Sequence, residues 1–210
     1  IHGSNQASLT ISKKPKLDVS NKLEWLVNYP YGCLEQTVSA VFPQLYLKNF
    51  ITTTEKGQKK LDENINAAIK NLRKFQLGNG AFSYWPGQVE ESRWATNYAG
   101  HFLISAQKLG YNVPDDLLEK WQKYQKYQAR ITEQNLTERV YRLYLLALNG
   151  QAEFGAMNLL KENEINKLND TQKWLLAGAY KLAGLENTAK QIASEAGIQV
   201  KEYENMDVTY

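Results

Sequence analysis

Apolar residues recur three and four positions apart along most of the chain, and this spacing predicts amphipathic helices. It is clearest in residues 59–76, where one face carries Leu61, Ile65, Ala68, Ile69, Leu72 and Phe75. The same spacing predicts further helices over residues 34–50, 93–109, 115–130, 137–148, 152–161, 171–182 and 188–196. Pro43 lies inside the first of these and should kink or divide it, because proline has no backbone N–H to donate.

Residues that disfavour helix separate these segments. The glycines expected to stop a helix are Gly110, Gly150, Gly184 and Gly197. Asn135 and Asp170 suit the N-cap position of the helices that follow them. Residues 77–87 combine Gly, Asn and Pro with three aromatic residues and predict turns instead of helix. Residues 8–26 predict an extended lead-in with one strand.

Glycine-terminated helices at intervals of roughly 35 to 40 residues predict an all-α fold of stacked helix pairs. Such pairs form either a closed double ring or an open solenoid, and the spacing does not choose between them. The aromatic residues of the later helices suit helix–helix packing. They are Trp121, Tyr124, Tyr127, Tyr141, Tyr144, Trp174 and Tyr180. The 210 residues fit one domain, with an extended lead-in or linker at residues 1–26 and a helical domain at residues 27–210.

Charge and composition narrow the possible functions. The 25 basic and 22 acidic residues give a net charge of +3 and are spread along the chain, which does not indicate nucleic-acid binding. No stretch reaches the roughly 18 apolar residues of a membrane span, and residues 1–6 resemble neither a secretion signal nor a native start. Cys33 is the only cysteine, so no internal disulfide, structural zinc site or other cofactor is expected. Cys33 is therefore either inert or reactive.

The residues around Cys33 favour a reactive thiol. They read Tyr29-Pro30-Tyr31-Gly32-Cys33-Leu34-Glu35-Gln36-Thr37, at the point where extended chain gives way to the first predicted helix. Residues three apart at a helix start lie on the same side, so the Cys33 sulfur and the Gln36 carboxamide are expected to meet. Unpaired backbone amides at a helix N-terminus also favour the thiolate. Attack of the sulfur on the Gln36 amide carbon would release ammonia and close a thioester ring.

This condensation depends on fixed proximity, because an amide is a poor electrophile. Well-oriented groups within one molecule reach effective concentrations of about 10⁵ to 10⁸ M. Gly32 lacks a Cβ and would let the backbone turn tightly beside the sulfur. Tyr29 and Tyr31 would supply part of an apolar wall that slows hydrolysis by water.

The run Gly32-Cys33-Leu34-Glu35-Gln36 resembles the thioester motif of the alpha-2-macroglobulin and complement family, and Tyr29-Pro30-Tyr31 before it is similar to the bacterial branch. Vertebrate members usually carry Gly at the Leu34 position, which also points to bacteria. Residues 76–87, followed by Trp94-Ala95-Thr96-Asn97-Tyr98-Ala99, are similar to the continuation of the same domain. The resemblance spans residues 29–114, and the remainder matches only in its helical character.

The resemblance implies a thioester-containing domain built as an alpha/alpha toroid, inside a much larger chain of β-sandwich domains. In this family a proteinase cuts a bait region elsewhere, the chain rearranges, and the exposed thioester acylates an amine of the proteinase, which is trapped. Gln36 would be the acyl donor and Cys33 the leaving thiolate. Gly32, Leu34 and Glu35 would form the frame around them.

Further implications concern the parent protein. It would be a single-turnover proteinase inhibitor rather than an enzyme, exported to the periplasm or cell surface, with or without a lipid anchor. Its partners would be proteinases and the other domains of the same chain, and this segment would not insert into a membrane. The family domain is usually longer, so the helical domain is expected to be incomplete at its C-terminal end. Without the neighbouring domains that shield the thioester, Cys33 is expected to be a free thiol.

Other side chains are expected to be structural. Some family members redirect the acyl group to hydroxyls through a histidine, but no motif aligns His101 with it, so direct reaction with amines is expected. His101 is expected to be a helix residue that is satisfied by hydrogen bonding or partly exposed. Trp85 and Trp94 are expected to pack in the core or in a turn.

Two functions of other classes stay open. A helical-repeat scaffold without covalent chemistry would bind a partner through its Tyr and Trp residues, but it leaves the Cys33 motif unexplained. An enzyme of cyclase or lyase type would share the toroid but needs an acidic cluster, and Asp115-Asp116 alone is typical of dipole compensation at a helix start. A cysteine protease fails for want of a positioned base with an orienting partner.

Overall fold

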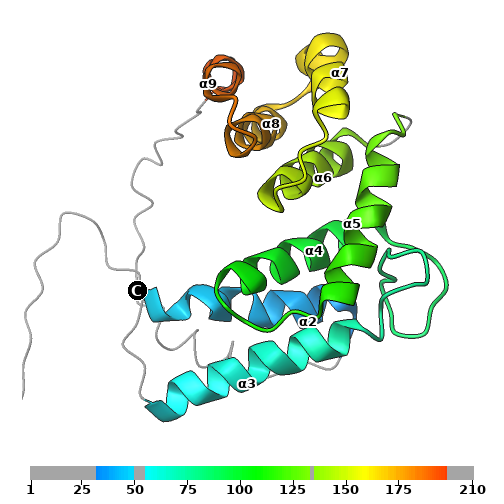
Figure 1. The fold of residues 1–210 in the computed structure, drawn as a ribbon, viewed down its shortest axis with the longest axis vertical. Helices are drawn as coiled ribbons and strands as arrows, with labels where there is room; N and C mark the ends of the chain where they lie inside the picture. Colours follow the sequence, from blue (N-terminus) through cyan, green and yellow to red (C-terminus); the bar gives the residue numbers. More distant parts are fainter. Residues whose placement is uncertain (1–31, 50–54, 133–134, 198–210) are drawn as a thin grey trace, which may run out of the picture.

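The computed structural model describes residues 32–49, 55–132 and 135–197, which form helices joined by short connections (Figure 1). In chain order the helices are α2 (Leu34–Val41), the 3₁₀ helix η1 (Pro43–Asn49), α3 (Glu55–Leu72), α4 (Arg93–Lys108), α5 (Asp115–Ala129), α6 (Leu136–Leu148), α7 (Phe154–Glu164), the 3₁₀ helix η2 (Ile165–Lys167), α8 (Asp170–Leu182) and α9 (Glu186–Ser194). Within these ranges the only β-type pairing is one bridge between Gln76 and Phe82. The expected all-α class is confirmed.

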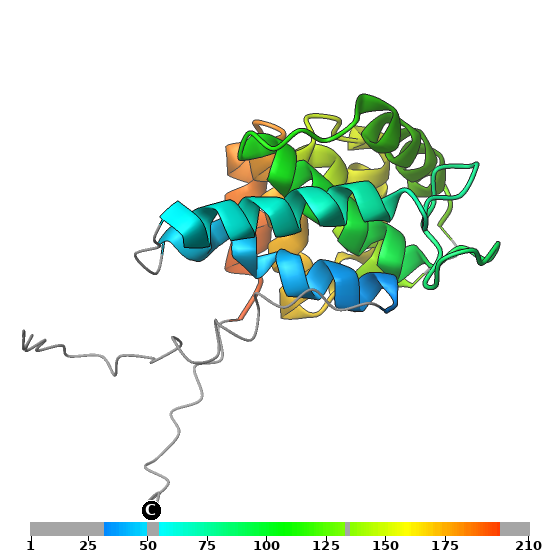
Figure 2. The same ribbon diagram turned by 90° about the horizontal axis from the view of Figure 1, so that it is seen from below.

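The helices form two groups, each around its own apolar core (Figures 1 and 2). Helices α2 to α5 enclose the first core, in which Phe102 and Trp121 are fully buried. Helices α6 to α9 enclose the second core, which includes Leu176 and Tyr180. Helix α6 joins the groups, because its Leu145 belongs to the first core while its other apolar face belongs to the second. None of the described helices is both long and apolar enough to cross a membrane.

Buried polar side chains tie α4, α5 and α6 together. The Asn97 carboxamide donates to the carbonyl oxygen of Glu138 at 3.1 Å and accepts from Gln125 Nε2 at 2.8 Å. Gln125 in turn accepts from Arg142 Nε at 2.7 Å. Burial lowers the pKa of Arg142 to about 10, because the charged guanidinium is desolvated. A buried charge requires such partners, so this network restricts how the three helices pack.

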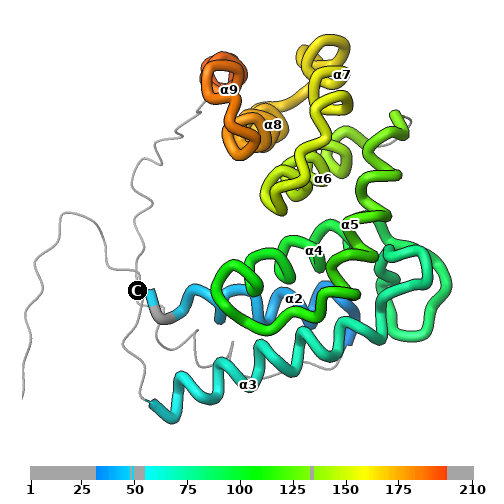
Figure 3. The backbone as a smooth tube through the Cα atoms, in the orientation of Figure 1, coloured from blue at the N-terminus to red at the C-terminus, as the bar shows by residue number. Residues whose placement is uncertain are grey.

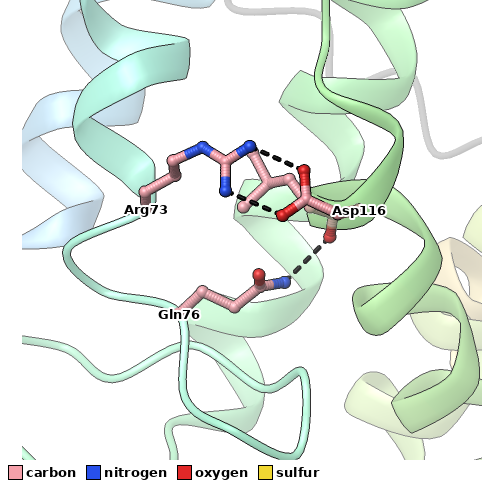
Figure 4. Close-up of polar contacts among 4 residues, drawn as sticks. Arg73, Gln76 and Asp116 are labelled. Carbon is pink, nitrogen blue, oxygen red and sulfur yellow. Dashed lines mark hydrogen bonds and ion pairs between the residues drawn. The ribbon is translucent and has the colours of Figure 1, made fainter.

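The connection between α3 and α4, residues 73–92, lies against the N-terminus of α5 (Figure 3). Arg73 donates two hydrogen bonds to the Asp116 carboxylate, at 2.8 and 2.6 Å, and Gln76 donates to the Leu117 carbonyl oxygen at 2.8 Å (Figure 4). The hydrogen bonds from Arg73 lower the pKa of Asp116. Ser83 closes the connection on itself by donating to the Phe75 carbonyl oxygen. These contacts give the loop a defined position beside α2.

The predicted helices are all present, and the structure corrects some of their limits. Pro43 divides the first segment as expected, since α2 ends at Val41 and η1 begins at Pro43. Helix α3 begins at Glu55 and ends at Leu72, so the expected range 59–76 is wrong at both ends. The C-terminal limit moves because the Phe75 N–H turns back to the Leu72 carbonyl oxygen and Gln76 pairs with Phe82.

The expected caps and stops are partly right. Asn135 caps α6 by accepting from the backbone of Thr137 and Glu138. The assignment of Asp170 is wrong, because Asn169 is the N-cap of α8. Gly197 does not stop α9, which ends at Ser194; its N–H instead donates to the Asp170 carboxylate at 3.1 Å. The three other glycines follow helix ends with φ between 71° and 88°, as a helix stop requires: Gly110, Gly150 and Gly184.

The aromatic residues of the later helices do not all pack between helices. Trp121 and Tyr180 are buried, but Tyr127 and Trp174 are 67% and 45% exposed, so the packing role expected for these two is wrong. The extended lead-in and its strand, at residues 8–26, lie outside the described residues. The expected boundary between this lead-in and the helical domain, at residues 26 and 27, also lies outside the described residues.

Candidate functional site

The candidate site is the N-terminus of α2, where Cys33 is the N-cap and Gln36 the third helical residue. Cys33 has extended backbone angles, φ −68° and ψ 167°, which start the helix without strain. The Gln36 carboxamide folds back so that its Oε1 accepts a hydrogen bond from the Cys33 backbone N–H at 3.3 Å. The Cys33 sulfur faces the Gln36 backbone N–H in the reciprocal arrangement of a capping box. Each side chain thus contacts the backbone N–H of the other residue, and direct contact of the sulfur with the carboxamide stays a prediction.

Gly32 makes this arrangement possible. A Cβ built on Gly32 would overlap the Gln36 Oε1 atom and lie 3.0 Å from its Cδ. The carboxamide therefore occupies the space that any larger residue at position 32 would fill. Gly32 was expected to allow a tight turn beside the sulfur, whereas the group that approaches it here is the Gln36 carboxamide.

One backbone hydrogen bond polarises the Gln36 carbonyl group. The N–H of Cys33 points at the carbonyl oxygen of Gln36, where negative charge develops when a nucleophile adds to the carbon. Cys33 is 4% exposed, whereas Gln36 is exposed to solvent. Cys33 is thus shielded from solvent while Gln36 lies at the surface beside it.

The loop at residues 73–92 completes the site through Tyr84. The Leu34 backbone N–H donates to the Tyr84 carbonyl oxygen at 2.9 Å, which satisfies one of the free amides of the helix start. The Tyr84 hydroxyl donates to Glu35 Oε2 at 2.7 Å. The hydrogen bond to Glu35 is the largest cause of the raised pKa of the Tyr84 phenol. Sequence reasoning did not identify Tyr84, because it is 49 positions from Glu35.

The structure covers two of the remaining predicted site residues, Leu34 and Glu35. Leu34 is fully buried in the first core and anchors the helix start. Glu35 is partly exposed and holds Tyr84, so its role exceeds that of a helix-start residue. Tyr29 and Tyr31, expected as an apolar wall, lie outside the described residues.

His101 lies at the other end of α2 from Cys33. Its ring meets Phe42, the C-cap of α2, edge-on at 5.0 Å between centroids, and its Nδ1 shares a 2.8 Å hydrogen bond with the Tyr141 hydroxyl. Burial lowers the pKa of His101 to about 4, so the ring is neutral at neutral pH. The expectation of a hydrogen-bonded structural histidine is confirmed.

Trp85 lies in a turn, one of the two places expected for it, whereas Trp94 lies on α4 and in neither the core nor a turn. They are 47% and 42% exposed. Trp85 meets the Tyr84 ring edge-on at 5.9 Å, and Trp94 stacks on Tyr98 at 5.8 Å. Both rings therefore cover neighbouring aromatic residues at the surface and do not enclose Cys33.

The acidic pair considered for a cyclase does not form an acidic cluster. Asp116 is engaged by Arg73, and Asp115 begins α5 beside it. Among residues 32–49, 55–132 and 135–197, no group of His, Cys, Asp and Glu has the arrangement of a metal site.

Comparison with known proteins gives matches to one family. The family model of the A-macroglobulin TED domain matches residues 7–130, which is more than half of the chain. The chain is 34% identical over 119 residues to alpha-2-macroglobulin of Escherichia coli, an alignment covering 55% of this chain and 7% of that protein.

Solved structures extend the likeness beyond residue 130. The native E. coli alpha-2-macroglobulin, from domain MG7 to the C-terminus, matches 88% of this chain and 32% of that one, with a TM-score of 0.75 and 26% identity. Salmonella alpha-2-macroglobulin reacted with methylamine matches 87% of this chain and 13% of that one, with a TM-score of 0.74 and 26% identity. The chain thus spans only a small part of its relatives, and its fold is the helical, toroid-like fold of their domain. The chain belongs to the A-macroglobulin TED domain family.

Proposed function

We propose that this chain is the thioester domain of a bacterial alpha-2-macroglobulin-like inhibitor, in which Cys33 and Gln36 form an internal thioester that acylates amines of an attacking proteinase. The observation that carries the proposal is the reciprocal contact of Cys33 with Gln36 across the space left by Gly32. Proximity of this kind supplies the rate that an unactivated amide lacks.

Three further points support the proposal. Gln36 is exposed while Cys33 is buried, so an amine would approach from the Gln36 side. Neutral His101 is held in an aromatic cluster away from Cys33, which favours direct transfer to amines. A Salmonella relative of the same fold has been crystallised after reaction with methylamine. We place the parent protein in the periplasm or at the cell surface, with proteinases and its own further domains as partners.

The test is the mass of the full-length protein. Thioester closure lowers the mass by about 17 Da through loss of ammonia, and methylamine then adds to Gln36 and frees one thiol. Peptide mapping should locate the added methylamine at Gln36 and the new thiol at Cys33. A Cys33→Ala variant and a Gln36→Ala variant should show neither change. Full mass and no response to methylamine in the wild-type protein would leave only a helical binding scaffold.

Trapping is tested separately. Incubation with trypsin should give an adduct that survives denaturing electrophoresis for the wild-type protein and not for Cys33→Ala. Cleavage of the parent without such an adduct would show that the thioester does not transfer to proteinases.

A further inference from the structure

Tyr84 contacts both of the residues that lie between Cys33 and Gln36. Its carbonyl oxygen accepts from the Leu34 backbone N–H at 2.9 Å, and its hydroxyl donates to Glu35 Oε2 at 2.7 Å. Leu34 and Glu35 are the first two residues of α2, so both contacts fall within the turn that joins Cys33 to Gln36. One loop residue therefore holds the whole span between the two groups of the proposed thioester, through its backbone and through its side chain.

The loop that carries Tyr84 is itself held by the first core. Ser83 is fully buried, and its backbone N–H and its hydroxyl donate to the Phe75 carbonyl oxygen at 2.9 and 3.1 Å. Phe82 is also fully buried, and its backbone N–H donates to the Thr96 hydroxyl of α4 at 2.8 Å. Tyr84 thus connects the start of α2 to backbone that cannot shift without disturbing the core.

The start of α2 depends on such a contact. Helix ends fray, because the first N–H groups have no partner within the helix. Cys33 and Gln36 satisfy the N–H groups of each other, but the Leu34 N–H has its partner outside the helix, in Tyr84. Fraying of this turn would carry the Gln36 carboxamide away from Cys33, and the reaction of an amide with a thiol depends on their proximity.

We propose that Tyr84 and Glu35 are positioning residues for thioester closure, an inference that rests on the proposed function. Their hydrogen bond holds the first turn of α2, so that the Gln36 carboxamide stays beside Cys33 until the two groups react. In closure the sulfur forms a bond to the carboxamide carbon, the carbon–nitrogen bond breaks, and the thiol proton leaves with the nitrogen as ammonia. Tyr84 and Glu35 exchange no proton in this step. Once the ring is closed, a covalent bond holds its two ends together without their help.

The experiment follows the full-length protein after cell-free synthesis and measures how fast the ammonia loss appears in the intact mass. Tyr84→Phe keeps the ring and the backbone contact with Leu34 and loses only the hydroxyl. A misplacement of about 1 Å costs about 100-fold in rate. Because the backbone contact remains, closure in Tyr84→Phe should be about tenfold slower than in the wild-type protein, and methylamine should then release the thiol at the wild-type rate.

Substitutions of Glu35 test the same hydrogen bond from its other end. Glu35→Ala removes the acceptor and should slow closure to a similar extent. Glu35→Gln retains an oxygen that accepts from the Tyr84 hydroxyl, so it should recover most of the rate that Glu35→Ala loses.

The matched control is Tyr111→Phe. Tyr111 donates to Asp62 at 2.8 Å, which is another phenol–carboxylate pair, between the α4–α5 connection and α3. Both Tyr→Phe variants lose one hydrogen bond and should unfold at a lower urea concentration than the wild-type protein. Only Tyr84→Phe should close slowly.

The outcomes separate this inference from the proposed function. Closure at the wild-type rate in Tyr84→Phe would overturn the inference and leave the proposed function intact. Equal slowing in Tyr84→Phe and Tyr111→Phe would do the same, because the effect would then be one of general stability. So would equally slow closure in Glu35→Gln and Glu35→Ala, or a methylamine step in Tyr84→Phe slowed as much as closure. Absence of ammonia loss in the wild-type protein would remove the proposed function, and this inference with it.

Discussion

At the N-terminus of α2 a single absent Cβ decides where the Gln36 carboxamide lies. Gln36 has several rotatable bonds and is exposed, so it gains little from packing and would otherwise be free to turn to solvent. The space above Gly32 lets it fold back, and the hydrogen bond from the Cys33 N–H keeps it there. Residue 32 therefore decides whether the carboxamide can lie beside Cys33.

Replacing Gly32 by alanine should reduce thioester formation. In the full-length protein Gly32→Ala places a methyl group on Gln36 Oε1, so the carboxamide must leave Cys33 and the ammonia loss should fall by about tenfold or more, since reaction depends on proximity. The thioester content of the variant is measured by its intact mass and by the thiol that methylamine releases. Gly78→Ala is the control, because a Cβ there meets nothing within 4 Å. Equal thioester content in both variants would contradict the steric account of Gly32.

The site could be predicted from the sequence only as far as it is local. Cys33 and Gln36 are three residues apart on one helix start, so their contact follows from helix geometry. Tyr84 comes from a loop whose path depends on contacts such as Gln76 with Leu117, and no periodicity encodes those. The choice between core and turn for Trp85 stayed open for the same reason, since the burial of a turn residue depends on what the loop packs against.

At the scale of single helices, the ends are decided by side chains that compete for the same free backbone groups. In α8, Asn169 accepts from the Gln172 N–H at 2.9 Å, and the Gln172 side chain returns the contact to the Asn169 N–H at 2.9 Å. Asp170, one residue later, instead accepts from Gly197 beyond the end of α9. Asn and Asp are both good caps, so the sequence Asn169-Asp170 left two registers open and the reciprocal bond with Gln172 selects the first.

The two residues should therefore contribute unequally to stability. Asn169→Ala removes a capping bond and should lower the free energy of unfolding by about 1 kcal/mol. Asp170→Ala loses an exposed contact and a favourable charge in the first turn, and should cost about 0.5 kcal/mol. Urea unfolding of the two variants beside the wild-type chain measures both values. A larger loss for Asp170→Ala would show that the helix start is capped by the carboxylate.

Helix positions were predictable because the apolar spacing is long and regular, as in α3, where the buried residues recur on one face. The ends of the helices were less predictable. After Leu72 the apolar spacing continues with Phe75, yet Gln76 lies outside the helix, where it pairs with Phe82 and donates a hydrogen bond to Leu117. Tertiary contacts outweigh local propensity at such ends.

On the scale of the whole molecule, the arrangement of two cores joined through α6 was not encoded in any one segment. Helix spacing allowed a closed ring or an open solenoid, and the choice depends on side chains that meet across the two groups. His101 of α4 is one of these: its ring contacts Tyr141 and Tyr144 of α6 edge-on, at 5.7 and 6.1 Å, and Phe42 at the end of α2. It is a titratable group at the contact between the groups.

This position makes the stability of the molecule depend on pH. The folded pKa of His101 is lowered to about 4, whereas the unfolded chain has the ordinary value of 6.5. As pH falls from about 6.5 to about 4, the unfolded state binds a proton that the folded state does not, so the free energy of unfolding should fall by about 3 kcal/mol from this residue; above pH 6.5 it should contribute no change.

Urea unfolding at pH 7 and pH 4 isolates this contribution when wild type is compared with His101→Gln. Carboxylates titrate in both proteins, so only the difference between their losses belongs to His101. Glutamine retains a hydrogen-bonding group for Tyr141 and has no proton to gain, so the variant should lose about 3 kcal/mol less than the wild type between the two pH values. Equal losses would mean that the ring is protonated without penalty in the folded state, which its enclosure by Phe42, Tyr141 and Tyr144 argues against.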